Sequence, residues 1–181
     1  MMKILVIQNK RIGDVLVSSV IANTIKKVFP NSHVTYFVYD YTTGVLINNP
    51  NINQIIEVNQ KKLKKPLNLI STIHNLRSEK YEIIYAQNPK FQRRVICLFS
   101  GAQYRIGFKR KHKKLRLPFY THPIDLLDKK SRNCGKAIED RINMITSVFD
   151  LKSEPDYEPK IFLSDKEKKY DRLQDIKKPV I

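Results

Sequence analysis

The stretch that decides the fold is KILVIQNKRIGDVLVSS, residues 3–19, in which an apolar run leads through a short polar turn into an apolar helix. The run KILVIQ (3–8) is apolar enough to form a strand buried on both faces, as in parallel sheets. A helix is predicted over residues 15–29. Its buried stripe repeats every three or four residues and consists of Val17, Val20, Ile21, Thr24 and Val28. Between strand and helix stand Gly13 and Asp14, and the question is whether Asp14 caps the helix or takes part in chemistry.

The rest of the chain repeats this alternation of strands and helices. Strands are predicted at 33–39, 52–58, 81–87 and 103–108. Helices are predicted at 67–78, 90–100 and 133–150, with a short helical piece around 42–49. Strands that alternate with helices imply crossover connections, so the sequence predicts an α/β fold with a largely parallel sheet.

Ligands of such sheets bind beyond the carboxyl ends of the strands. Three segments are expected at that edge: 9–14, 40–44 and 87–94. The loop 109–123 is expected to overhang the same edge.

The positive charge of the chain is concentrated in its middle third. The formal net charge is +17, and residues 61–120 carry 16 Lys and Arg against two Asp and Glu. Residues 1–60 carry five against three, and residues 121–181 carry 13 against 12. One basic region is typical of a surface that meets an anionic partner, such as nucleic acid, anionic lipid or a phosphorylated sugar. The alternative is a set of ordinary solvated lysines.

Several classes of protein are disfavoured by composition. The two cysteines, Cys97 and Cys134, have no CxxC spacing, which argues against a disulfide framework or a zinc site and fits a reducing cytoplasm. The four histidines are scattered, so no metal site is expected. No run of about 18 apolar residues exists in the sequence, so no membrane-spanning helix is predicted.

The last third changes character. The segment 151–160 (LKSEPDYEPK) is polar with two prolines, as a linker would be, and Ser164 to Glu167 form a capping box that opens another helix. Pro179-Val180-Ile181 reads as the opening of a strand. We therefore expect a first domain over 1–150, a linker over 151–160 and the start of a second, truncated domain over 161–181.

Four stretches together resemble a known family. They are KILVIQNKRIGDVLVSSVIANTIKKVFPNSHVTYFV, NNPNINQIIEV, YEIIYAQN and LFSGAQYRIGF. In this order and at these separations they resemble the amino-terminal domain of family 9 glycosyltransferases, the ADP-heptose:lipopolysaccharide heptosyltransferases. The resemblance implies a Rossmann-like domain that forms the first half of a two-domain (GT-B) enzyme. It implies no cofactor, and it places the ADP-heptose-like nucleotide-sugar donor mainly on the second domain.

The resemblance also implies an activity and a set of site residues. The activity is inverting transfer of a heptose or related sugar to the anionic inner core of lipopolysaccharide, with the fragment alone expected to be inactive. Asp14 would be the general base, whereas composition alone favours an N-cap. Residues that hold the acceptor are expected to be Lys10, Arg11, Gly13, Gln87, Asn88, Lys90, Arg93 and Arg94. The sequence departs from the family after the fourth strand, where Gln87-Asn88-Pro89-Lys90 replaces the usual Gln-Gly.

A membrane contact is implied as well, because the family's acceptor is presented at the inner face of the cytoplasmic membrane. We expect a cytoplasmic protein that is peripheral to this membrane. Lysines near an anionic bilayer contribute about 1 kcal/mol each. The surface expected to make the contact consists of Lys109, Arg110, Lys111, Lys113 and Lys114.

Two rival functions remain at the level of sequence. A nucleic-acid-binding module would fit the isoelectric point of about 9.9 and the basic region. The sequence has no helix-turn-helix, zinc or RNA-recognition signature, so nucleic acid is the less favoured partner. A nucleotide-binding Rossmann domain would carry GxGxxG after the first strand, and this sequence does not.

Overall fold

The computed structural model describes residues 1–87, 90–109, 118–127, 136–151 and 153–169. Within these residues, six strands form one parallel sheet in the order β3-β2-β1-β4-β5-β6. The strands are β1 (Lys3–Ile7), β2 (His33–Tyr39), β3 (Gln54–Val58), β4 (Ile83–Ala86), β5 (Tyr104–Phe108) and β6 (His122–Ile124). This order is typical of Rossmann folds, so the predicted α/β Rossmann-like architecture is confirmed.

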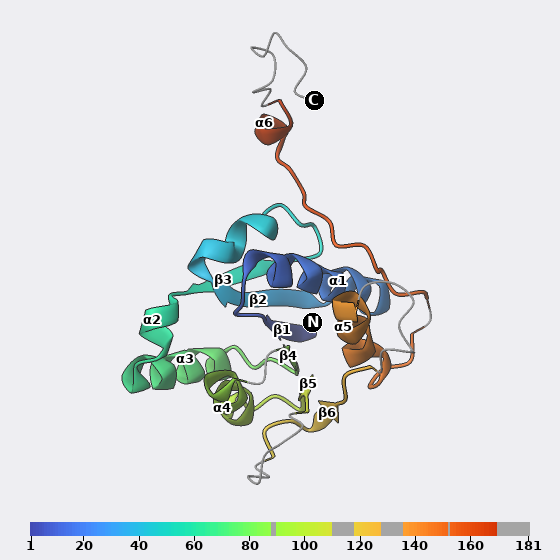
Figure 1. Ribbon diagram of the computed structural model, residues 1–181. Coiled ribbons are helices and arrows are strands. Elements are labelled where there is room, and N and C mark those ends of the chain that lie inside the picture. Colours follow the sequence, from blue (N-terminus) through green and yellow to red (C-terminus); the bar gives the residue numbers. More distant parts are fainter. Residues whose placement is uncertain (88–89, 110–117, 128–135, 152, 170–181) are drawn as a thin grey trace.

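Helices cover both faces of the sheet (Figure 1). One face carries α1 (Ile12–Val28), the 3-10 helix η1 (Asp40–Val45) and α5 (Lys136–Thr146). The other carries α2 (Gln60–Leu63), α3 (Pro66–Ser78) and α4 (Phe91–Phe99). Strand β1 divides its side chains between the two layers, since Ile4 and Val6 pack beneath α1 whereas Leu5 and Ile7 pack on the side of α4.

Helix α1 differs from its prediction in its start and in the width of its buried surface. It begins at Ile12 rather than at residue 15, and Val17 and Val28 are only half-buried. Its contacts with the sheet include Val15, Ile21 and Ile25. The predicted stripe is confirmed at Val20, Ile21 and Thr24, which are fully buried. The buried surface of α1 is wider than this stripe because the helix packs against the sheet, against α5 and against the segment after α5.

The segment 109–123 is not only a loop, because its end begins the edge strand β6, which pairs with β5. Sequence reasoning missed β6 because it has three residues, one of them Pro123, and is too short to show a period of two. It also missed the four-residue α2. Gly101 lies just after α4 with φ +79°, the left-handed conformation in which glycine commonly ends a helix.

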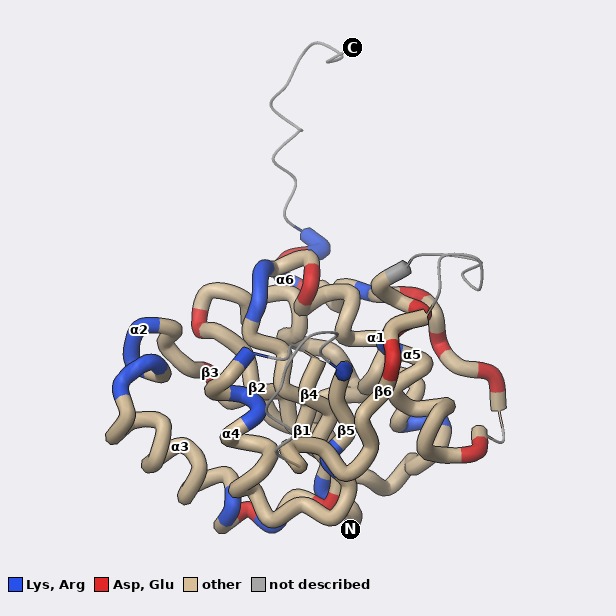
Figure 2. Tube along the Cα trace, turned by 60° about the horizontal axis from the view of Figure 1, so that its bottom comes forward, with Lys and Arg blue, Asp and Glu red and all other residues tan. Residues whose placement is uncertain are grey.

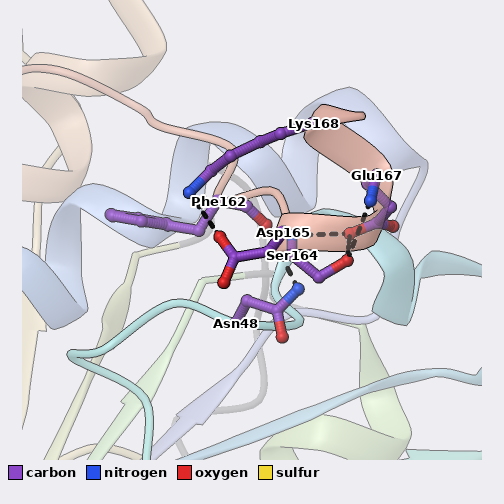
Figure 3. A network of polar contacts seen from close by, with 6 residues as sticks. All are labelled: Asn48, Phe162, Ser164, Asp165, Glu167 and Lys168. Atoms are coloured by element: carbon purple, nitrogen blue, oxygen red, sulfur yellow. Dashed lines mark hydrogen bonds and ion pairs between the residues drawn. The ribbon is translucent and has the colours of Figure 1, made fainter. Parts of the chain in front are cut away.

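The segment after α5 runs along α1 before it reaches α6 (Asp165–Lys168), as Figure 1 shows. The Asp156 amide donates to Thr24 Oγ1 at 3.1 Å. The capping box of α6 is confirmed: Ser164 Oγ accepts from the Glu167 amide and Glu167 Oε2 accepts from the Ser164 amide (Figure 3). Asn48 Nδ2 donates to the carbonyl of Phe162 at 3.4 Å and holds this end of the chain against the η1–β3 connection.

The division into a first domain (1–150), a linker (151–160) and the start of a second domain (161–181) stays a prediction. Residues 170–181, with the expected strand opening at Pro179, lie outside the described residues.

Candidate functional site

A cavity of about 550 Å³ opens at the carboxyl edge of the sheet. The order of the strands reverses between β1 and β4, whose following helices, α1 and α4, lie on opposite faces of the sheet. A crevice at such a position is where α/β sheets bind ligands. The cavity is lined by Asn9, Lys10, Arg11, Asp14, Tyr39, Tyr41, Gln60 and Lys90.

Asp14 lies in this cavity but does not cap α1. The N-cap of α1 is Arg11, so Asp14 is the third residue of the helix, and the N-cap interpretation is wrong. Its side chain is 31% exposed, and its Oδ1 accepts from Lys10 Nζ at 3.2 Å. The backbone carbonyl of Asp14 accepts from Gln8 Nε2 at 3.0 Å, which ties the first turn of α1 to the end of β1. The carboxylate is therefore fixed in place and still open to the cavity.

Gly13 is not needed for the turn that precedes α1. It is the second helical residue, and it is not among the described glycines with positive φ. A Cβ built on it would meet no atom of the described residues within 4 Å. The space beside Gly13 is consistent with its expected part in acceptor binding, which stays a prediction.

For Arg93, the structure corrects the expectation of direct contact with an acceptor. Arg93 is only 2% exposed and does not line the cavity. Its Nε donates to Asn9 Oδ1 at 3.2 Å, and its Nη2 donates to the Asn9 carbonyl and to the Tyr39 hydroxyl. Burial lowers the pKa of Arg93, and the adjacent Tyr39 opposes that shift. Arg93 thus supports two residues of the cavity from behind.

The other residues predicted for acceptor binding are distributed around this edge. Lys10, Arg11 and Lys90 line the cavity. Gln87 is buried at the end of β4, and Arg94 stacks on Phe119, with its guanidinium carbon 3.9 Å from the ring centroid. Asn88 lies outside the described residues.

The predicted membrane surface is mostly outside the described residues, which exclude Arg110, Lys111, Lys113 and Lys114. Lys109 is described and forms an ion pair with Asp125 at 2.5 Å.

Buried amides gather at the ends of β1 and β4. Among the residues that the structure describes, both side-chain polar atoms of Gln87, together with Gln8 Oε1 and Asn9 Nδ2, have no hydrogen-bond partner. Gln8 and Gln87 lie side by side, because each follows the last paired residue of β1 or β4. The backbone amide of Gln87 donates to the Ile7 carbonyl at 3.3 Å. Buried polar groups in proteins almost always have partners, so this edge favours a polar ligand.

The site residues predicted from the sequence did not include four that line the cavity, Asn9, Tyr39, Tyr41 and Gln60, nor the nearby Arg141. Tyr39 and Tyr41 form a stacked pair with ring centroids 5.8 Å apart, and the Tyr41 hydroxyl donates to the Lys10 carbonyl at 3.4 Å. Arg141, on α5, is buried over the ring of Phe108. Burial lowers the pKa of Arg141, while the negative charges of Asp14 and Asp140 oppose the shift. No sequence motif marks Arg141, since only the packing of α5 beside α1 brings it towards Asp14.

Among the described residues, no group of three His, Cys, Asp or Glu side chains could hold a metal ion. The described helices are all too short or too polar to cross a bilayer.

The chain is similar to several known proteins. No family model matches the chain. Lipopolysaccharide heptosyltransferase 3 of Escherichia coli is 24% identical over 141 residues, which cover 75% of this chain. The resemblance to glycosyltransferase family 9 is confirmed. A family 9 glycosyl transferase from Veillonella parvula superposes with a TM-score of 0.72 at 23% identity over 91% of this chain. The E. coli ADP-heptose lipopolysaccharide heptosyltransferase II gives 0.69 at 21% identity over 92%.

The chain spans only part of these relatives. It covers 40% of the E. coli heptosyltransferase 3, 46% of the Veillonella protein and 48% of heptosyltransferase II. The solved structures therefore support the Rossmann-like fold of this chain.

Proposed function

We propose that this chain is the acceptor-binding half of an inverting glycosyltransferase that transfers a heptose, or a related sugar, to the inner core of lipopolysaccharide. The observation that carries the proposal is the carboxylate of Asp14, which lies at the reversal point of the sheet in an open, polar cavity. Three cationic residues of the same cavity, Lys10, Arg11 and Lys90, match the sugar acids and phosphates of such an acceptor. The similarity to heptosyltransferases supports the same assignment.

In the proposed reaction, an acceptor hydroxyl oxygen attacks the anomeric carbon of the donor sugar from the face opposite the nucleotide. The bond from that carbon to the phosphate oxygen breaks, the nucleoside diphosphate leaves, and the configuration inverts. Asp14 takes the hydroxyl proton. A positioned base of this kind typically contributes about 10²–10⁴-fold to the rate. The ion pair with Lys10 orients the carboxylate, and the Gln8 hydrogen bond holds the helix turn that carries it.

The proposed reaction has two substrates, an acceptor and a donor. The acceptor is anionic lipopolysaccharide core, the donor is a nucleotide sugar such as ADP-heptose, and the donor binds mainly a second domain. The protein acts at the cytoplasmic face of the inner membrane, where Lys109 and the basic segment after it contribute charge.

Asp14→Asn in the full-length protein tests the proposal. We expect turnover with ADP-heptose and a lipopolysaccharide acceptor to fall by about a hundredfold or more, with acceptor affinity nearly unchanged. The matched control is Asp150→Asn, which removes the same charge from an exposed residue that does not line the cavity. The control should keep turnover within about threefold of the wild type. Normal turnover of Asp14→Asn would overturn the catalytic role.

A further inference from the structure

A basic and apolar surface lies beside the cavity, at the connection between β3 and β4. Its members are here named the α2–α3 surface: Lys61, Lys62, Lys64, Lys65, Leu67 and Ile70. It begins at the carboxyl edge of the sheet, because Gln60, the first residue of α2, lines the cavity. Figure 2 shows the lysines of α2 at one side of the molecule and the acidic residues that follow α5 at the other.

The four lysines are exposed and have no fixed counter-charge. None of their ammonium groups forms an ion pair or hydrogen bond within the part of the chain that the structure describes. Two other exposed lysines of the described chain, Lys160 and Lys168, form ion pairs with Glu158 and Asp165. Four unpaired positive charges within five residues produce a strongly positive local potential.

Two large aliphatic side chains stand next to these lysines. Leu67 is 80% exposed and Ile70 is 63% exposed, and among the described residues only Met1 is a large apolar residue more exposed than both. They lie three residues apart, on one side of α3. The opposite side of α3 packs against the sheet and α4 through Leu69, Ile73 and Leu76. Leu67 and Ile70 therefore contribute nothing to the core.

We propose that the α2–α3 surface docks on an anionic lipid bilayer. Lysines attract the negative surface, while Leu67 and Ile70 enter the boundary between head groups and acyl chains, as the apolar face of an interfacial helix does. Nucleic acid is the less suitable partner, because exposed aliphatic side chains gain nothing against phosphates. The orientation places the cavity, with Asp14, next to the membrane surface. The inference rests on the proposed function only in assuming an acceptor that is held in a membrane. Binding to lipid is measured without sugar transfer, so the two proposals can fail independently.

Co-sedimentation of the full-length protein with vesicles tests the proposal. The vesicles contain phosphatidylcholine with 30% phosphatidylglycerol (roughly the anionic fraction that gives surface potentials of this kind), and pure phosphatidylcholine serves as the neutral comparison. Replacement of Lys61, Lys62, Lys64 and Lys65 by Gln is expected to weaken binding to the anionic vesicles by about a hundredfold or more at low salt. Leu67→Gln with Ile70→Gln is expected to weaken binding by about tenfold, and this loss persists at high salt because it is not electrostatic.

Matched controls separate the site from net charge and from general apolarity. Replacement of Lys160, Lys166, Lys168 and Lys169 by Gln removes the same number of charges near α6. Ile161→Gln with Leu163→Gln removes two other exposed aliphatic residues there. Both controls should bind anionic vesicles within about threefold of wild type. Vesicle binding that is unchanged in the α2–α3 variants would overturn the proposal, as would equal losses in the controls. Loss of binding to duplex DNA with vesicle binding intact would assign the surface to nucleic acid instead.

Discussion

Arg93 on α4 donates hydrogen bonds to both the side-chain and the backbone oxygens of Asn9, which follows β1. Through these bonds, the helix after β4 holds the loop after β1. The same guanidinium donates to the hydroxyl of Tyr39 at the end of β2 at 3.0 Å, with its carbon 5.7 Å from the Tyr39 ring centroid. One buried cation therefore joins the carboxyl ends of three strands, and the wall of the cavity depends on it.

Arg93→Met is expected to lower the free energy of unfolding by about 2–4 kcal/mol, since it leaves the buried oxygens of Asn9 and Tyr39 without their donor. Urea unfolding followed by circular dichroism measures the change. The control is Arg94→Met, which loses the contact with Phe119 and should cost about 1 kcal/mol or less. Equal losses for the two variants would show that the Arg93 network does not hold the loop.

Gly13→Ala tests whether Gly13 leaves space for a substrate, because its effect on turnover is expected to be opposite to its effect on stability. Because a Cβ at Gly13 meets no atom of the described residues within 4 Å, and the residue is helical, alanine should raise the free energy of unfolding by up to about 1 kcal/mol. Turnover in the full-length protein should nevertheless fall by about tenfold or more if an acceptor sugar packs against this glycine. Both quantities are measured on the same preparation.

The control for this substitution is Gly44→Ala in η1, where a Cβ also meets nothing within 4 Å. It should leave turnover unchanged, because Gly44 does not line the cavity. Turnover of Gly13→Ala equal to that of wild type would mean that the space beside Gly13 has no role in binding.

The sheet was largely predictable from the sequence because its central strands, β2, β1 and β4, are buried on both faces. The strand at 33–39 has the predicted bounds, and β5 differs by one residue, since continuous apolar runs with polar ends mark such strands clearly. The edge strand β6 left no such signal. Its pairing with β5 is a tertiary effect: the ring of Tyr120, just before β6, fills the space above Gly107, where a Cβ would lie 2.4 Å from the ring.

The site was predictable only in part. Lys10, Arg11, Asp14 and Lys90 come together at one cavity because loops after parallel strands share an edge. The N-cap interpretation of Asp14 failed because α1 starts with an arginine N-cap, which propensities do not favour. The burial of Arg93 could not be read from spacing, since its partners come from β1 and β2. Similarly, Arg141 reaches the region of Asp14 only through helix packing.

Two buried tyrosines lie on the same face of the sheet, and replacing each by phenylalanine should change the free energy of unfolding differently. The Tyr36 hydroxyl donates to the Ser18 carbonyl at 2.7 Å, whereas the Tyr85 hydroxyl is buried with no partner among the described residues. At pH 7, Tyr36→Phe should lower the free energy of unfolding by about 1 kcal/mol. Tyr85→Phe should leave it unchanged or raise it by about 1 kcal/mol, because it removes an unsatisfied buried hydroxyl. A lower urea midpoint for Tyr85→Phe than for wild type would contradict this.

The same two variants should respond alike to alkaline pH. Burial raises the pKa of both phenols above their usual range, and it raises the pKa of the Cys97 thiol to about 12. The unfolded chain releases these protons near their ordinary pKa values, about 10 for tyrosine, while the folded chain keeps them. Stability is therefore fully present below the unfolded pKa and falls as the pH rises towards the folded one, by about 1.4 kcal/mol per pH unit for each tyrosine. Urea midpoints between pH 9 and about 11 should decline less steeply in both Phe variants than in wild type. This holds even though the two substitutions are expected to change the free energy of unfolding at pH 7 differently. Parallel declines in all three proteins would show that these phenols ionise in the folded state as readily as in the unfolded one.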